Sequence, residues 1–222
     1  MTTVSASPPS LRADFYLDLI CPWCWIGLRH LRAAWDGLRA EYPGVQLQLV
    51  WHADALLPQI PEQGTPYQAF YEARLGSEQA VAARRAQVRA AAQTVDLQLN
   101  FDAIETFPNT RLVCALVNQA QHQLAGDAMF AWVESIYAAY FVHGKNIGSI
   151  AVLQALAQAA GLAWDAESLQ QQGHPRGPGP AGGVPHYRFN QQVQVTGAVP
   201  AAELRQLMRQ AMAMAMAPAH AG

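Results

Sequence analysis

The sequence predicts an α/β fold in which a small mixed sheet is built from the two ends of the chain around an all-helical insertion. Three observations indicate this fold. The spacing of apolar residues near the N-terminus changes from that of a strand to that of a helix and back. The long middle of the chain has helical spacing, and the C-terminal part has the pattern of a hairpin followed by a helix. The predicted order is therefore β-α-β, a helical block, then β-β-α.

The first three elements are expected within residues 14–51. Side chains alternate in "DFYLDLI" (14–20) and again in "VQLQLVW" (45–51), as is typical of strands. Proline and glycine in "YPG" (42–44) end the helix between them. Apolar residues at helical spacing define the buried face of this helix: Cys24, Leu28, Leu31, Trp35, Leu38 and Tyr42. The preceding "MTTVSASPPSLR" is expected to be a short flexible lead-in.

The middle of the chain, residues 65–161, is rich in alanine, glutamine and leucine. It fits four or five helices and no strand, with breaks at Gly76, "FPNT" (107–110), "LAGD" (124–127) and "HGKN" (143–146). This block is expected to be an inserted helical domain, residues 59–172. The entropy of closing a loop grows slowly with its length, so an insertion of this size is tolerable.

The C-terminal part is expected to complete the sheet. "GHPRGPGPAGG" (173–183) is too rich in proline and glycine for a helix or strand. "HYRFN" (186–190) and "VQVTG" (193–197) predict a hairpin, and Pro200 opens a last helix. The sheet domain is therefore assigned residues 12–58 and 173–216.

Composition excludes several classes of function. Apolar residues make up 51% of the 222 residues and charged residues 14%, which indicates a well-buried globular chain. The net charge of −2 and the lack of a basic stripe argue against nucleic-acid binding. No apolar run is long enough to cross a membrane, and the N-terminus lacks the features of a secretory signal. We therefore expect a cytoplasmic protein without a membrane partner.

Two cysteines, Cys21 and Cys24, lie where the first strand gives way to the helix. A thiol at the start of a helix meets unpaired backbone N–H groups and the positive end of the helix dipole, which favour the nucleophilic thiolate. Pro22 occupies the helix-opening position that proline prefers. We expect Cys21 to attack and Cys24, one turn further on the apolar face, to resolve the mixed disulfide. Two packed core thiols are the alternative, and a metal site with His186 is a weaker one.

A second feature supports the redox interpretation. "GGVPHY" (182–187) places Pro185 at the start of a predicted strand, directly after a glycine-rich turn. Proline there removes a hydrogen-bond donor from the sheet and, if cis, bends the chain sharply. An ordinary trans turn proline is the alternative.

Taken together, these motifs resemble the DsbA-like thioredoxin-fold family, and most closely its FrnE-like cytosolic branch. The resemblance extends from about Arg12 to Met212. It is carried by "DLICPWCWIG" (18–27), "LLPQIPEQG" (56–64), "ARLGS" (73–77), "PNTRLVCAL" (108–116), "FVHGKNIGS" (141–149), "LAQAAGL" (156–162), "GGVPHYRFN" (182–190) and "VTGAVP" (195–200). The family is related to 2-hydroxychromene-2-carboxylate isomerase and kappa-class glutathione transferase.

The resemblance implies a thioredoxin fold with a helical insertion, and dithiol–disulfide exchange as its chemistry. It implies that Cys21 is the nucleophile and Cys24 the resolving thiol, with Pro22 and Trp23 between them. It also implies that Pro185 is a cis-proline facing the pair and that substrate backbone docks beside Val184.

Three further residues are candidates near the pair. Asp18 precedes Cys21 by three residues, and it is a candidate to move protons or equally to cap a turn. His186 could share a proton with the pair, although a solvent-facing strand histidine is favoured. Relatives commonly carry a histidine where this chain has Cys114, which we expect to be a packed core thiol and not a third redox centre.

The sequence therefore predicts a thiol–disulfide oxidoreductase that reduces or isomerises disulfides in protein or small thiol substrates. No bound cofactor or metal is expected, and glutathione is a possible co-substrate. One alternative is a glutathione-dependent isomerase or transferase of the same fold, whose members usually keep a serine in place of Cys21. Another is a client-binding chaperone without catalysis. A homodimer is left open.

Overall fold

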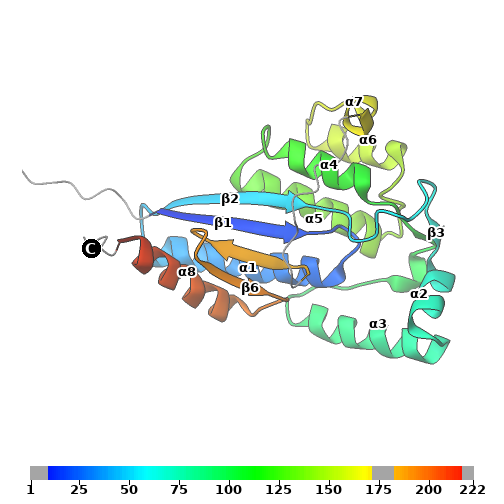
Figure 1. Ribbon diagram of the computed structural model, residues 1–222, viewed down its shortest axis with the longest axis horizontal. Coiled ribbons are helices and arrows are strands. Elements are labelled where there is room, and N and C mark those ends of the chain that lie inside the picture. The colour runs from blue at the N-terminus through cyan, green and yellow to red at the C-terminus, as the bar shows by residue number, and fades with distance from the viewer. Residues whose placement is uncertain (1–9, 172–182, 217–222) are drawn as a thin grey trace, which may run out of the picture.

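A computed structural model describes residues 10–171 and 183–216. Its main sheet has the strand order β2-β1-β5-β6. β1 (Ser10–Leu17) is parallel to β2 (Gln46–Ala53) and antiparallel to β5 (His186–Phe189). β6 (Val193–Thr196) completes an antiparallel hairpin with β5. Figure 1 shows that the two ends of the chain form one mixed sheet, as the sequence predicts.

The first strand begins earlier than the sequence predicts. Ser10 pairs with Gln46, and Leu11 is 1% exposed, so these residues belong to β1 and not to a flexible lead-in. The strand ends at Leu17, and the next residues form a turn closed by a hydrogen bond of 3.1 Å from the Cys21 N–H to the Asp18 carbonyl. Residues 1–9 lie outside the described part of the chain.

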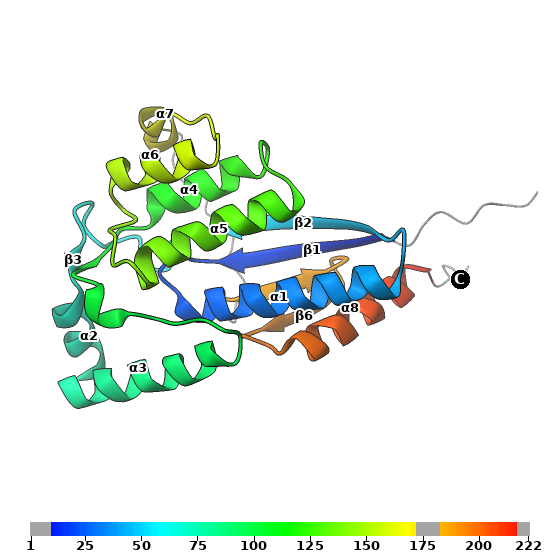
Figure 2. The ribbon, with the colours of Figure 1, turned by 180° about the vertical axis from the view of Figure 1, so that it is seen from behind.

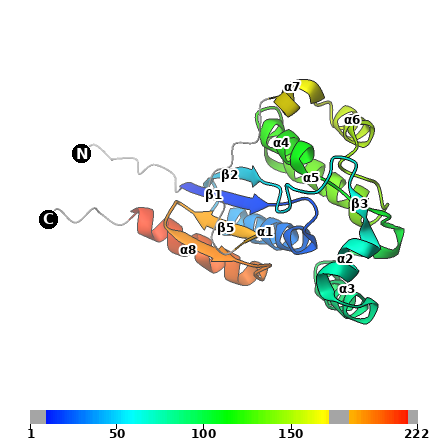
Figure 3. The same ribbon diagram turned by 45° about the vertical axis from the view of Figure 1, so that its right-hand side comes forward.

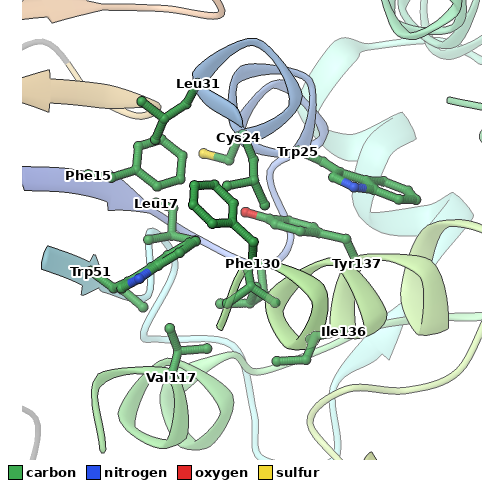
Figure 4. Close-up of a cluster of buried hydrophobic side chains, with 14 of the residues drawn as sticks. Phe15, Leu17, Cys24, Trp25, Leu31, Trp51, Val117, Phe130, Ile136 and Tyr137 are labelled. Atoms are coloured by element: carbon green, nitrogen blue, oxygen red, sulfur yellow. The ribbon is translucent and has the colours of Figure 1, made fainter. Parts of the chain in front are cut away.

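One face of the sheet carries the hydrophobic core. Leu11, Ala13, Phe15 and Leu17 of β1 all point to it and are buried. It is covered by α1 (Pro22–Glu41), α5 (Gly126–Phe141) and α8 (Ala201–Met216), which lie in front of the strands in Figure 2. Figure 4 shows Phe15 of β1, Trp51 of β2 and Phe130 of α5 in this cluster. The edge-to-face contacts of Trp51 with Phe15 and Phe130 join the sheet to the insertion.

The segment between β2 and β5 is mainly helical, as predicted. Its helices are α2 (Tyr67–Leu75), α3 (Glu78–Gln93), α4 (Arg111–Ala120), α5, α6 (Ile150–Ala159) and α7 (Ala166–Gln171), with a 3₁₀ turn η1 (Phe101–Ala103). The expectation that it contains no strand is wrong. β3 (Thr65–Pro66) pairs with β4 (Thr106–Phe107) and ties the start of α2 to the loop before α4. Strands of two residues are too short to show the alternation of apolar and polar residues by which a sequence predicts a strand.

The helices of this segment meet the sheet at its β2 edge and at the end where β1 stops. On α4, Asn118 and Gln121 hydrogen-bond through their side-chain amides to the backbone of Ala53 and Trp51 at 2.8–3.1 Å. These bonds satisfy backbone N–H and C=O groups on the outer edge of β2, where no further strand pairs with it. α2 and α3 lie beyond the sheet near the start of α1 (Figure 3). Among the described helices, none combines the length and apolar character needed to span a membrane.

Two glycines of α1 provide a matched test of how closely α1 packs on β5. A Cβ on Gly27 would overlap the hydroxyl oxygen of buried Tyr187 and touch the ring of Pro185. We expect Gly27→Ala to lower the free energy of unfolding by about 1–3 kcal/mol because this space cannot expand cheaply. A Cβ on Gly37 would meet only the guanidinium end of the Arg205 side chain, which can move away.

Gly37→Ala is therefore the control. It should leave stability unchanged or raise it by up to about 1 kcal/mol, since alanine is favoured over glycine within helices. Urea unfolding followed by circular dichroism measures both variants. Equal stability of the two variants would contradict the packing of Gly27 against Tyr187 and Pro185.

Candidate functional site

The cysteine pair lies at the start of α1. Cys21 is the N-cap residue and Pro22 the first residue of the helix, as predicted. Cys21 is partly exposed, whereas Cys24 is 0% exposed and belongs to the core. The backbone N–H of Cys24 donates to the carbonyl of Cys21 at 3.0 Å, which closes the first turn. Both residues are free thiols, so the structure describes the reduced pair.

The segment before β5 lies directly beside Cys21. The Cys21 thiol is 4.0 Å from the carbonyl oxygen of Val184, which is 163 residues away in the chain. The peptide bond between Val184 and Pro185 is cis. Pairing of β5 with β1 holds this segment against the start of α1, and Pro185 packs beside Gly27. The structure thus brings together Cys21, Cys24, Val184 and Pro185.

Asp18 is a fully buried carboxylic acid whose backbone carbonyl accepts the Cys21 N–H. Its Oδ2 accepts a hydrogen bond of 2.7 Å from the N–H of Leu56, and its Oδ1 accepts one of 3.3 Å from the N–H of Ile20. Burial raises the pKa of Asp18 to about 6, although these hydrogen bonds oppose the change. Asp18 therefore fastens the turn before Cys21, which is one of the two roles that the sequence allows.

Besides burial, the charge of Asp18 raises the pKa of both buried thiols, Cys24 and Cys114. Burial raises the pKa of Cys24 well above its usual range, and the nearby charges of Cys21 and Asp18 add to this effect. Cys114, on α4, is 2% exposed and its Sγ donates to Oδ1 of Asp18 at 3.8 Å. Burial and the charge of Asp18 raise the pKa of Cys114 as well. Cys114 is a buried thiol, as expected, but its contact with Asp18 was not foreseen.

His186 lies on the opposite face of the sheet from the pair. It faces Tyr16, with ring centroids 5.5 Å apart, and its Nδ1 lies 2.7 Å from the hydroxyl of Thr196. It is only 7% exposed, so the expectation of a solvent-facing histidine is wrong. To share a proton with the cysteines, or to bind a metal together with them, His186 would have to lie on the face of the sheet that carries the pair. In residues 10–171 and 183–216, no group of three or more His, Cys, Asp or Glu side chains could hold a metal ion.

Two buried tyrosines near the pair were not singled out from the sequence. Tyr137, on α5, donates its hydroxyl to the Asp18 carbonyl at 3.1 Å and joins Cys24 in the cluster of Figure 4. Tyr187, on β5, stacks on Phe15 with ring centroids 5.1 Å apart. Burial, then the charges of Cys24 and Cys21, raise the pKa of both phenols. Tyr187 could have been found, because it lies two residues after Pro185 and so shares its face of β5.

A polar network on the other face of the sheet was also missed. Asp14 is 0% exposed, and its carboxylate is held by Arg12 at 2.9 Å, by His52 at 2.8 Å and by Gln191. Burial alone would raise the pKa of Asp14, but the hydrogen bonds from Arg12 and His52 hold it below its usual range. Because its partners come from different strands and a turn, their convergence cannot be read from local spacing. The network joins β1, β2 and the β5–β6 turn.

A pocket of about 540 Å³ opens beside the exposed thiol. Cys21, Pro22 and Trp23 line one side, and aromatic, aliphatic and arginine side chains of α2 and α3 line the other. The guanidinium of Arg84 lies 5.5 Å from the ring centre of Trp23. The helical segment therefore encloses space in front of Cys21 and shields the start of α1 on one side.

The Cys114–Asp18 contact leads to a prediction about the third thiol. Cys114→Ala should keep disulfide exchange within about threefold of the wild-type rate, since Cys21 and Cys24 are chemically complete without it. It should lower the free energy of unfolding by about 1 kcal/mol through the small cavity that it leaves. Exchange rates and urea unfolding measure the two effects. Loss of most activity in a variant that remains folded would make Cys114 a third redox centre.

The fold and this site together define a class of proteins, the thioredoxin-like proteins with a helical insertion. The profile of the DSBA-like thioredoxin domain matches residues 12–173. The chain therefore belongs to the DSBA-like thioredoxin domain family. No curated protein matches the sequence.

Solved structures show the same fold at low sequence identity. A probable DsbA oxidoreductase from Streptomyces coelicolor is 22% identical, with a TM-score of 0.68, over 91% of this chain and 90% of that chain. The cytosolic disulfide reductase DsbM from Pseudomonas aeruginosa, solved with GSH, is 18% identical, with a TM-score of 0.56, over 92% and 96%. A 2-hydroxychromene-2-carboxylate isomerase is 13% identical, with a TM-score of 0.51, over 90% and 95%. The fold is thus shared with a probable oxidoreductase, a disulfide reductase and an isomerase.

Proposed function

We propose that this protein catalyses dithiol–disulfide exchange through Cys21 and Cys24 on protein or small-molecule disulfides. The observation that carries the proposal is the difference between the two thiols. Cys21 is accessible at a helix N-terminus, whereas Cys24 is 0% exposed within the core one turn away. Only an accessible thiol can meet a substrate disulfide, and only an adjacent one can then release it.

In the first step, the Cys21 thiolate attacks one sulfur of the substrate disulfide. A new bond forms between Cys21 and that sulfur, the substrate S–S bond breaks, and the other substrate sulfur leaves as a thiolate that takes a proton from solvent. Cys21 caps the N-terminus of α1, where the positive end of the helix dipole favours a negatively charged attacking group. The proposed docking side for substrate backbone is the Val184 carbonyl, which lies 4.0 Å from the Cys21 thiol.

In the second step, Cys24 attacks the sulfur of Cys21. The Cys21–Cys24 disulfide forms, and the second substrate sulfur leaves as a thiolate, so the protein gives two electrons in total. The pKa of Cys24 is raised by burial, so its thiol must lose a proton at this point. Asp18 is the proposed acceptor, since it is buried nearby and its pKa of about 6 leaves it mostly ionised at neutral pH.

Glutathione is the proposed reductant that returns the oxidised pair to two thiols. Two glutathione molecules would reduce one Cys21–Cys24 disulfide and leave as glutathione disulfide. The structural likeness to the disulfide reductase DsbM, solved with GSH, supports this choice. A glutathione transferase needs no second cysteine, and Cys24, placed to resolve a mixed disulfide, favours exchange.

Equilibration with mixtures of reduced and oxidised glutathione tests the proposal. We expect one two-electron transition in which Cys21 and Cys24 become linked, while Cys114 stays alkylatable after denaturation. The midpoint should lie between those of thioredoxin and DsbA, about −270 and −120 mV, because Trp23 supplies no charge between the cysteines. Peptide mass spectrometry after alkylation identifies the linked residues. Failure to form the Cys21–Cys24 link at any ratio would contradict the proposal.

A further inference from the structure

The pocket in front of Cys21 combines aromatic walls with positive charge. Its aromatic wall includes four rings, each in contact with at least two of the others: Tyr67, Phe70, Tyr71 and Phe107. Phe70 and Phe107 stack with ring centroids 3.9 Å apart. Leu56 and Leu75, which also line it, are 47% and 37% exposed. Tyr67 and Phe107 are 3% and 2% exposed, so the aromatic surface open to a ligand is that of the half-buried Phe70 and Tyr71.

The charge of this pocket is positive and largely uncompensated. Its lining includes Arg74, Arg84 and Arg85 but no aspartate or glutamate. Arg85 pairs with Asp102 at 3.5 Å. In the described part of the chain, no carboxylate lies within ion-pair distance of Arg74 or Arg84. This contrasts with the net charge of −2 of the whole chain.

The arginines and the reactive thiol surround the same tyrosine. Burial raises the pKa of Tyr71, the charge of Cys21 adds to the effect, and the charges of Arg74, Arg84 and Arg85 oppose it. Arg84 also lies over Trp23, between the two cysteines in sequence. A ligand in the pocket would thus be close to Cys21 and to guanidinium groups at the same time.

We propose that this pocket selects low-molecular-weight disulfides that have an aromatic body and a carboxylate, and presents their S–S bond to Cys21. The inference rests on the proposed exchange chemistry and names its substrate class. The aromatic ring of the ligand packs on Phe70 and Tyr71, which Phe107 supports from behind, while the carboxylate pairs with Arg74 or Arg84. A volume of about 540 Å³ suits a small molecule better than a loop of a folded protein.

The reaction in the pocket has the same two steps as the exchange proposed above, and its atoms and electrons balance in the same way. Cys21 forms a mixed disulfide with one half of the ligand, and the other half leaves as an aromatic thiolate. Cys24 then displaces the second half and closes the Cys21–Cys24 disulfide. One ligand disulfide and one protein dithiol yield two aromatic thiols and one protein disulfide.

Stopped-flow oxidation of the reduced protein by three disulfides tests the inference. Ellman's reagent is aromatic and carries two carboxylates, dipyridyl disulfide is aromatic and neutral, and dithiodipropionate carries two carboxylates without a ring. Each rate is divided by the rate with free glutathione, which removes differences in intrinsic reactivity. We expect the normalised rate to be highest for Ellman's reagent and to fall toward that of dipyridyl disulfide at high ionic strength.

The double variant Arg74→Gln/Arg84→Gln tests the charges directly. Its normalised rate with Ellman's reagent should fall about tenfold, as expected from two exposed ion pairs, while its rate with dipyridyl disulfide should fall by at most about twofold. Arg209→Gln on α8 is the matched control, because Arg209 pairs with Glu41 far from the pocket. It should change neither rate. An equal fall for both reagents, or no fall, would overturn the inference.

The same assay separates this inference from the proposed function. If Cys21→Ser stops oxidation by every reagent but the arginine substitutions leave the preference intact, exchange stands and the substrate class is wrong. If Cys21→Ser reacts as fast as the wild type, the exchange chemistry itself is wrong and the inference falls with it.

Discussion

Cys21→Ser should lose disulfide exchange almost completely, by at least about a thousandfold, because removal of the nucleophile leaves no group able to open the substrate bond. Cys24 cannot replace it, since its thiol is 0% exposed and its pKa is raised by burial. Stability should change little, because Cys21 is partly exposed and serine is also a good N-cap residue. Turnover of a small disulfide with glutathione and glutathione reductase measures the loss.

Cys114→Ser is the matched control for this prediction. It also exchanges a thiol for a hydroxyl, but at a buried position on α4 away from the pocket lining. It should retain exchange activity even if it is less stable. A Cys21→Ser protein with more than about a tenth of wild-type turnover would place the nucleophile elsewhere.

The second large effect is expected at Asp18. Its pKa is about 6 in the folded protein, against an ordinary value of 3.8, because burial penalises the charged carboxylate. A raised pKa means that the folded state holds the proton more tightly than the unfolded state. Protonated Asp18 therefore adds to the free energy of unfolding. This contribution is fully present below about pH 4 and is lost as the pH rises through 6. The difference of about two pH units corresponds to about 3 kcal/mol.

Asp18→Asn removes this titration while keeping a side chain of the same shape. From pH 4 to pH 7.5, the free energy of unfolding of the wild type should fall by about 2 kcal/mol relative to the variant, since other groups titrate alike in both proteins. Urea unfolding at several pH values measures the difference. A constant difference across this range would contradict the buried, titrating carboxylate.

The same substitution should slow the chemistry at one step only. If Asp18 accepts the proton of Cys24, Asp18→Asn should slow release from the mixed disulfide by about a hundredfold. Attack by Cys21 should keep its rate, because that step needs no proton transfer to Asp18. A quenched-flow experiment that separates the two steps would distinguish this effect from a general loss of structure.

The sequence predicted those parts of the fold that local patterns control. Period changes located β1, α1 and β2, and glycine or proline breaks separated the helices from α2 to α6. The start of α1 could be predicted because Pro22 has a strong positional preference. The order of the elements predicted that the two ends of the chain share one sheet, but not that β5 pairs with β1, since no local signal links segments so far apart.

Features that depend on convergence in space could not be predicted. Ser10 extends β1 only because β2 begins opposite it, and the short pair of β3 and β4 exists only through its partners. The burial of His186 depends on Tyr16 and on the β5–β6 hairpin. Cys114 meets Asp18 across 96 positions of the chain, so its neighbour could not be named from the sequence.

The central claim is that two thiols one helical turn apart have different tasks. The most direct measurement is trapping: Cys24→Ser is mixed with a substrate disulfide, quenched with acid and analysed by peptide mass spectrometry. We predict a stable mixed disulfide with the substrate on Cys21, and none in the matched Cys21→Ser protein. Substrate trapped equally on Cys24 in Cys21→Ser, or on Cys114 in either variant, would contradict the division of roles.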